Sequence, residues 1–330
     1  MTWCLTGGVF AAQAKSDLVY KVDYLASLQP DQKGFWVTVE VDKGELLGRV
    51  LFSNAKKRFT HIKANGKLIE RDDQVEWQLP KGKAKLQYFT LITHEKDKGK
   101  FDAYYGNEWA IFRGDDLVPA FHTYEKEGAY SQASIKFSLP SNWTVKSPWK
   151  NQGRFDFVID NPERRFDRPI GWFIVGKIGT RHANVSGTSI TVASPKESGM
   201  QRMEVITFFS FIWPEVKKTF GLVPEKLLIL GAPDPMWRGG LSAPNSLYLH
   251  VDRPLVSENG TSPLFHEITH MITRIRGKVT DKHNDDWIAE GLAEYYSFEL
   301  LHKAGGISKN RKKKILKKLA DWGKDVKHLR

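Results

Sequence analysis

The first half of the chain alternates hydrophobic and polar residues with the period of two that is typical of β-strands. The alternation is clearest at 34–41, 85–92 and 133–139. Turn-forming residues such as Asn65-Gly66 and Pro140-Ser-Asn142 separate runs of this kind. We therefore expect residues 15–165 to form a β-rich, sandwich-like domain with few helices.

From residue 166 the pattern becomes mixed. Short hydrophobic runs predict strands, and a stretch with helical spacing runs from Met200 to Phe220, with Pro214 as an expected kink. The predicted strands are 170–176, 189–193, 226–230 and 247–251. The fold class predicted for the whole chain is α+β, with residues 166–330 forming a second domain of mixed sheet and helices.

Two helices in this second region have clear end signals. Ser262 is a suitable N-cap, Pro263 suits the first helical position, and Gly277 is expected to end the helix, with Arg274 in its last turn. The next helix is marked by Asp285-Asp286 before Trp287 and by Gly305-Gly306 after it.

The first of these helices contains His266-Glu267-Ile268-Thr269-His270. Two histidines four residues apart lie about 40° apart around a helix axis, so both imidazoles can reach one metal ion. Glu267 is then placed to face water at the metal, and Glu290 in the second helix is the third candidate ligand. Three protein ligands and an open position are typical of catalytic zinc, so we expect one Zn2+ per chain. The alternative is coincidence, because helical histidine pairs often only cap or pack.

This motif, with Glu290-Gly-Leu-Ala-Glu-Tyr295 downstream, resembles the gluzincin metallopeptidases, most closely the aminopeptidase N and glycyl aminopeptidase branches. The resemblance implies that residues 166–330 form a zincin-like metallopeptidase domain. It also implies that His266, His270 and Glu290 bind zinc and that Glu267 is the general base. It also implies that Glu294 orients a ligand histidine; the alternative is a solvent-facing glutamate.

The chain departs from the family pattern at three points. First, 19 residues separate His270 from Glu290, one more than usual, which implies a bulge, because the neighbouring Ala289 cannot bind metal. Second, the family's donor to the reaction's oxyanion lies well downstream, whereas this chain ends 40 residues after Glu290. Either the part carrying that donor is missing, or it comes from one of the remaining candidates, His283, His302 and His328.

The third departure concerns specificity. The stretch from Arg238 to Ser246 resembles the glycyl aminopeptidase G-G-L-E-H pattern, with Ser242 and Ala243 where Glu and His would stand. The carboxylate that would anchor a substrate's free amine is absent, so aminopeptidase and endopeptidase action both stay open. The run at 247–251 is expected to act as an edge strand that binds an extended peptide. The alternative is an ordinary buried strand, and both can hold at once. The expected substrate-binding residues are Gly239, Gly240, Leu241, Ser242 and Tyr248.

The net charge of +12 is concentrated at the C-terminus, since residues 301–330 carry eleven Lys/Arg and two Asp. Ser308–Trp322 has helical spacing, which predicts an amphipathic helix with a solvated lysine face, or with a weak attraction for anionic polymers. We see no nucleic-acid-binding motif and expect no such partner.

The apolar start of the chain contains its single cysteine, Cys4, and ends in Ala12-Gln-Ala14. The alanines match a signal-peptidase site, so residues 1–14 are predicted to be the remnant of a secretory signal; the alternative is an N-terminal strand. No later run of eighteen apolar residues occurs, so no membrane span is expected. These features favour a periplasmic or secreted bacterial protein, whose oligomeric state the sequence does not indicate.

The function predicted from these features is a zinc-dependent peptidase that acts on peptides or proteins. Two alternatives stay open: a catalytically silent zincin that binds peptides or cell-envelope polymers, and a zinc hydrolase of a non-peptide bond.

Overall fold

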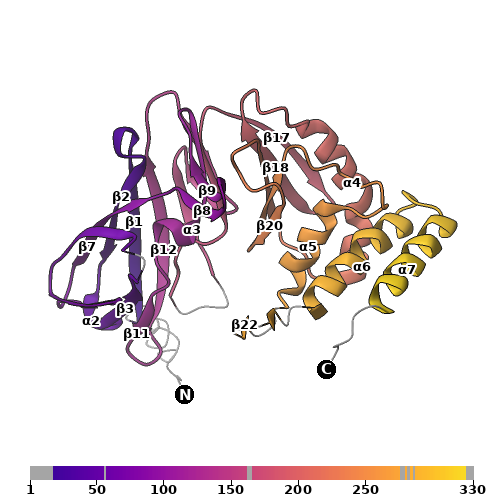
Figure 1. Ribbon diagram of the computed structural model, residues 1–330. Coiled ribbons are helices and arrows are strands. Elements are labelled where there is room, and N and C mark those ends of the chain that lie inside the picture. The colour runs from indigo at the N-terminus through magenta and orange to yellow at the C-terminus, as the bar shows by residue number, and fades with distance from the viewer. Residues whose placement is uncertain are drawn as a thin grey trace, which may run out of the picture. The chain divides into compact units, whose positions relative to one another are not determined.

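The computed structural model describes residues 18–55, 57–161, 166–275, 279–280, 283–284 and 287–324. The predicted signal remnant and Cys4 lie outside these residues. The chain divides into two compact units (Figure 1). The first contains the chain up to His94, Ala103–Val145 and Trp149–Gly176, and the second contains Glu95–Asp102, Lys146–Pro148 and the chain from Lys177 onward.

The largest sheet of the first unit has seven strands, in the order β14-β15-β12-β1-β2-β7-β4. β1 runs parallel to β12 and antiparallel to β2. Buried and exposed residues alternate along β1, as the sequence pattern predicts. The strands are β14 (Lys150–Gly153), β15 (Asp156–Ile159), β12 (Tyr130–Ser138), β1 (Val19–Gln29), β2 (Gly34–Val41), β7 (Ala84–Leu91) and β4 (Phe59–Ala64).

Two smaller sheets complete the β-rich part of the chain. One has four strands: β11 (His122–Tyr124), β3 (Arg49–Ser53), β6 (Gln74–Gln78) and β5 (Lys67–Arg71). The other has five: β13 (Thr144–Lys146), β16 (Trp172–Gly176), β10 (Trp109–Arg113), β9 (Lys100–Tyr105) and β8 (His94–Asp97). The helices here are single turns: η1 (Pro30–Gln32), α2 (Gly44–Leu47) and α3 (Gly114–Leu117).

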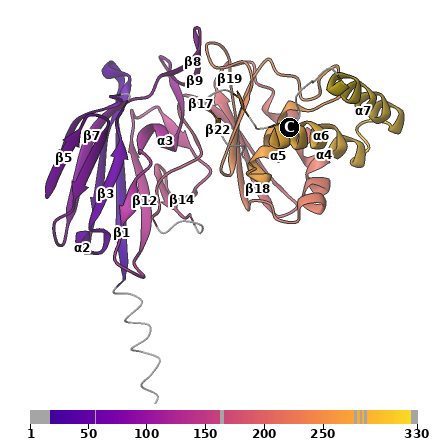
Figure 2. The same ribbon diagram turned by 60° about the horizontal axis from the view of Figure 1, so that its bottom comes forward.

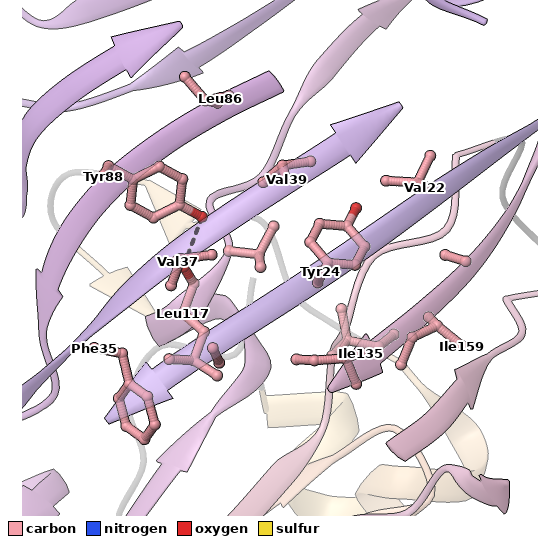
Figure 3. Packing of buried hydrophobic residues seen from close by; sticks show 14 of the residues in the cluster. Val22, Tyr24, Phe35, Val37, Val39, Leu86, Tyr88, Leu117, Ile135 and Ile159 are labelled. Carbon is pink, nitrogen blue, oxygen red and sulfur yellow. Dashed lines mark hydrogen bonds between the residues drawn. The ribbon is translucent and has the colours of Figure 1, made fainter. Parts of the chain in front are cut away.

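The core of the first unit is formed by the inward-facing side chains of these strands. Figure 3 shows Val22 and Tyr24 of β1 near Ile135 of β12 and Val39 of β2. The hydroxyl group of a buried tyrosine usually has a hydrogen-bond partner. That of Tyr88 donates a hydrogen bond of 2.8 Å to the carbonyl oxygen of Leu117 (Figure 3).

The second unit is built on a five-stranded sheet in the order β17-β18-β19-β21-β20. β18, β19 and β21 are parallel, and the two edge strands are antiparallel to their neighbours. The long helix α4 (Arg202–Phe220) provides the crossover that a parallel pair requires between β18 and β19. The strands are β17 (Ile178–Val185), β18 (Thr188–Pro195), β19 (Lys226–Ala232), β21 (Ser246–His250) and β20 (Gly240–Ala243).

Three further helices follow the sheet (Figure 2): α5 (Pro263–Thr273), α6 (Trp287–Lys303) and α7 (Lys309–Lys324). A short ladder of β22 (Val279–Thr280) and β23 (His283–Asn284) lies between α5 and α6 in the sequence. α6 lies between α5 and α7 (Figure 1). The predicted N-cap is confirmed, because the hydroxyl of Ser262 accepts a hydrogen bond from the backbone N–H of Phe265.

The predicted end of α5 is wrong. The helix stops at Thr273, and Arg274 leaves it with a left-handed φ of 53° while its N–H still donates to the His270 carbonyl oxygen. Gly277, the expected terminator, lies outside the described residues. Pro214 lies within α4 as predicted.

The predicted α+β class is confirmed, since a β-rich region precedes a mixed sheet with helices. In the part of the chain that the structure describes, no helix has the length and apolarity needed to cross a membrane.

Candidate metal centre and active site

The structure brings His266 and His270 of α5 together with Glu290 of α6. The two Nε2 atoms are 3.1 Å apart. The Glu290 carboxylate oxygens lie 3.2 Å from Nε2 of His266 and 3.4 Å from Nε2 of His270. One donor atom from each residue fits within 4.8 Å of the others.

These distances fit a tetrahedral metal ion. Ligands about 2.0–2.1 Å from zinc in a tetrahedron lie about 3.3 Å from one another. The three observed spacings are close to this value, and the two that involve Glu290 are made by its two different carboxylate oxygens. Two imidazole nitrogens and one carboxylate oxygen are also a donor set that zinc accepts at catalytic sites. The side chains of His266, His270 and Glu290 therefore form a donor cluster that fits one such ion.

Packing explains why these side chains face one another. α5 buries Phe265, Ile268 and Met271 in the core of the second unit, which turns its two histidines toward α6. On α6, Ala289 is buried, whereas the next residue, Glu290, is exposed. The orientation of α6 about its axis therefore brings Glu290, and not Ala289, to the histidines.

Glu294 lies one turn beyond Glu290 and contacts the other side of His266. Its carboxylate oxygen is 3.5 Å from Nδ1 of His266. Burial lowers the pKa of His266, but the hydrogen bond that its ring donates to Glu294 and the nearby carboxylates of Glu267 and Glu290 outweigh this and raise it. The contact holds Nδ1 as the protonated nitrogen and leaves Nε2 directed at the donor cluster.

Glu267 is the other acidic residue of the motif, and it points to the sheet side of the cluster. Burial is the main cause that raises its pKa to about 7, while the charge of His266 and a hydrogen bond from the backbone N–H of Ser242 act in the opposite direction. Its carboxyl group therefore lies between the histidine helix and strand β20.

Gly240 makes this approach possible. A Cβ atom at this position would lie 2.5 Å from Cγ and 2.6 Å from Oε1 of Glu267, closer than side chains tolerate. Gly239 is equally constrained, because a Cβ there would lie 2.2 Å from Nε1 of Trp237. Both glycines of the predicted Gly-rich stretch are thus needed for close packing around Glu267 and Trp237.

The remaining predicted substrate residues differ in position. Leu241 and Ser242 lie on β20, the edge strand of the sheet, and are partly exposed. Tyr248 lies instead on β21, the buried strand next to β20. There its hydroxyl group donates a hydrogen bond of 3.0 Å to the carbonyl oxygen of Trp237. This hydrogen bond helps to fix the segment that leads into β20.

Among the proposed oxyanion donors, only His302 has a described side chain. It lies near the C-terminal end of α6, with Nδ1 3.1 Å from the carbonyl oxygen of Ile307. The side chain of His283 and all of His328 lie outside the description. Sequence reasoning missed Trp237 and Lys96, which contact each other near β20. They are far apart in the sequence, and neither belongs to a motif.

A cavity of about 850 Å³ lies in the first unit and contains none of these groups. It lies along β1, β12 and β15 and is lined by residues such as Asp23, Ser134 and Asp167. The donor cluster is therefore recognised by its chemistry and spacing rather than by an enclosed volume.

The α+β fold of this chain is similar to the folds of solved zinc metallopeptidase structures. The chain is similar to a crystal structure of an aminopeptidase N family protein from Idiomarina loihiensis, with a TM-score of 0.65 and 15% identity over 88% of this chain. It is also similar to two structures of an M1 zinc metallopeptidase from Deinococcus radiodurans, one of them a mutant bound to a Tyr-Ser-Ala substrate. Their TM-scores are 0.55 and 0.54, each at 16% identity, and they cover 93% and 94% of this chain and 74% of their own.

The chain spans 56% of the length of the Idiomarina structure. Its sequence matches no protein-family model and no curated protein. The structural likeness therefore establishes the fold, and the activity has to be argued from the site.

Proposed function

We propose that this chain is a zinc-dependent peptidase. The observation that supports it is the spacing of 3.1–3.4 Å among the donor atoms of His266, His270 and Glu290, on a fold shared with zinc metallopeptidases. These three residues would hold one zinc ion. When bound, zinc acts as a Lewis acid that polarises a carbonyl group and makes water nucleophilic at neutral pH.

The roles of the neighbouring side chains follow from their positions. Glu267 lies beside the donor cluster but points to β20, so it is free of the ligand set and is placed to take a proton from water and pass it to the leaving amine. Glu294 holds the ring of His266 in one orientation and tautomer. An edge strand such as β20 is suited to hydrogen-bond the backbone of an extended peptide next to Glu267.

The test compares the zinc content and the peptide cleavage of matched variants. Glu267→Gln should keep one zinc per chain, measured by mass spectrometry of the metal, and lose cleavage by a factor on the order of 10²–10⁴, as expected for a removed general base. His266→Ala should lose both zinc and cleavage.

Glu204→Gln, an exposed substitution of the same kind on α4, is the control and should behave as the wild type. Cuts in a peptide library are mapped by mass spectrometry, so their positions also distinguish trimming of ends from internal cleavage. Equal cleavage by the wild type and Glu267→Gln would refute the proposed function.

A further inference from the structure

The segment that leads into β20 is fixed by a hairpin from much earlier in the sequence. Phe101 of β9 accepts a hydrogen bond of 2.8 Å from the N–H of Trp237 and donates one of 3.1 Å to the carbonyl oxygen of Pro235. Lys100 and Arg238 both pair with Asp234. Residues 95–102 and 234–238 therefore form one connected structure within the second unit.

This hairpin places a positive charge over an aromatic ring. Nζ of Lys96 lies 5.0 Å from the ring centroid of Trp237, the geometry of a cation–π contact. The indole in turn packs on the backbone of Gly239, and the carbonyl oxygen of Trp237 accepts the hydrogen bond from Tyr248. Lys96 is thus held beside the start of β20 although its side chain is exposed.

From Lys96 a continuous line of contacts reaches Glu267. The ammonium group lies over Trp237, the indole lies on Gly239, and the next residue, Gly240, lies against the Glu267 side chain. Lys96 therefore lies at the edge of the site around Glu267.

The carboxylates of Glu290 and Glu294 and those of the hairpin are engaged with other partners. Glu290 faces the histidines, and Glu294 contacts His266. On the hairpin, Glu95 accepts a hydrogen bond of 2.7 Å from Gly99, and Asp97 accepts one of 2.8 Å from Lys98. Among the described residues, Lys96 itself forms no ion pair; its contact is the ring of Trp237.

We propose that Lys96 and Trp237 form a subsite that binds a carboxylate of the peptide substrate. The indole would support the apolar part of the bound residue while the ammonium group pairs with its anionic end. The carboxylate is that of an acidic side chain near the scissile bond or of the peptide's own C-terminus. The inference rests on the proposed peptidase function and adds a substrate class to it.

The test measures binding and cleavage separately, with three peptides of equal length and blocked N-termini. One carries an internal glutamate and a C-terminal amide, one carries glutamine and a free C-terminal carboxylate, and one carries glutamine and an amide. Binding is measured by calorimetry on zinc-loaded Glu267→Gln protein, and cleavage on the enzyme with Glu267 intact.

We expect one of the two anionic peptides to bind about threefold to tenfold more tightly than the neutral peptide, the range for a partly exposed ion pair supported by an aromatic ring. The preferred peptide identifies the source of the carboxylate. Lys96→Met should abolish this preference, Lys96→Glu should reverse it, and Lys96→Arg should retain it. Lys98→Met, which removes an exposed lysine two residues further along the same hairpin, is the matched control and should keep the preference.

The inference is overturned if the protein with Lys96 binds neither anionic peptide more tightly than the neutral peptide. It is also overturned if Lys96→Met retains the preference as Lys98→Met does. Failure of the peptidase proposal has a different signature. In that case no peptide is cleaved, while the Lys96-dependent preference in binding persists.

Discussion

Single atoms decide the geometry around Glu267, and Gly240 shows this most directly. The backbone of β20 approaches the carboxyl group so closely that no side chain fits between them. The same approach brings the N–H of Ser242 to the carboxylate. A residue without a Cβ atom is therefore part of what positions the proposed general base.

Replacing Gly240 with alanine should displace Glu267 without removing the metal ligands. We expect zinc content to stay at the wild-type level and kcat to fall by a factor on the order of 10², since displacing a catalytic group by about an ångström has an effect of that size. Gly323→Ala is the control, because a Cβ atom at this position on α7 would meet nothing within 4 Å. Wild-type kcat in Gly240→Ala would show that the close approach is irrelevant to catalysis.

A second residue-scale prediction concerns Asp167, a buried carboxyl group of the first unit. Burial raises its pKa from 3.8 to about 6, even though hydrogen bonds from Asn161 and Ser131 oppose the shift. Between about pH 4 and pH 6 the folded chain thus binds a proton that the unfolded chain has released, and so its stability falls as the pH rises through this window.

Asp167→Asn should remove this dependence. The free energy of unfolding of the variant, relative to the wild type, should rise between pH 4 and pH 6 by on the order of 1–2 kcal/mol and then level off. Urea unfolding at a series of pH values measures it, with the exposed Asp72→Asn as the control. A difference between variant and wild type that is constant with pH would contradict the assignment.

The two histidines of the motif could be grouped from the sequence because their relation is local. A spacing of four on a helix brings His266 and His270 to one side wherever the helix lies, and the structure places them together with Glu290. Lys96 and Trp237 were not predictable in this way. Their contact depends on backbone hydrogen bonds between Phe101 and the segment before β20, and no local pattern encodes such a pairing.

At the scale of whole elements, the predicted helices α5, α6 and α7 are all observed, and the clear error is the end of α5. The start of α5 was correct because the side chain of Ser262 caps it. Its end was wrong because Arg274, which has no special tolerance for positive φ, adopts the left-handed conformation there. The amphipathic C-terminal helix was predicted over 308–322 and is observed as α7, Lys309–Lys324.

The attachment of α7 to α6 leads to the third prediction. Lys312 pairs with Glu299, a buried carboxylate of α6, and Ile315 is the buried apolar residue of α7. Lys312→Met should leave Glu299 buried without its partner and destabilise the docking of α7 by about 1–3 kcal/mol. Hydrogen exchange of the α7 amides should then accelerate, whereas that of β18 and β19 should not.

The matched control is Lys313→Met, which removes an exposed lysine from the same helix. The double variant Lys312→Met with Glu299→Gln should recover part of the lost protection, because a neutral amide is less costly to bury than an unpaired carboxylate. Equal exchange in Lys312→Met and Lys313→Met would mean that the ion pair does not hold α7.

At the scale of the whole molecule, the chain consists of two compact units, each with its own hydrophobic core. The proposed zinc ligands lie only in the second unit, on α5 and α6. An ion that binds the folded but not the unfolded form stabilises the part of the chain that contains its ligands. The metal should therefore affect the two units unequally, and this difference can be measured without any assay of activity.

Removing zinc should selectively lower the thermal stability of the second unit. At a free zinc concentration one hundred times the Kd, linkage contributes about 2.7 kcal/mol, which corresponds to a Tm shift of several degrees for a unit of this size. We expect calorimetry with a chelator to lower one transition, with hydrogen exchange assigning the loss to α5 and α6 and leaving β1 and β2 unchanged. His266→Ala should start at the lowered Tm and show no further response to the chelator. If the chelator shifted the wild type and His266→Ala equally, the metal would bind somewhere other than the cluster of His266, His270 and Glu290.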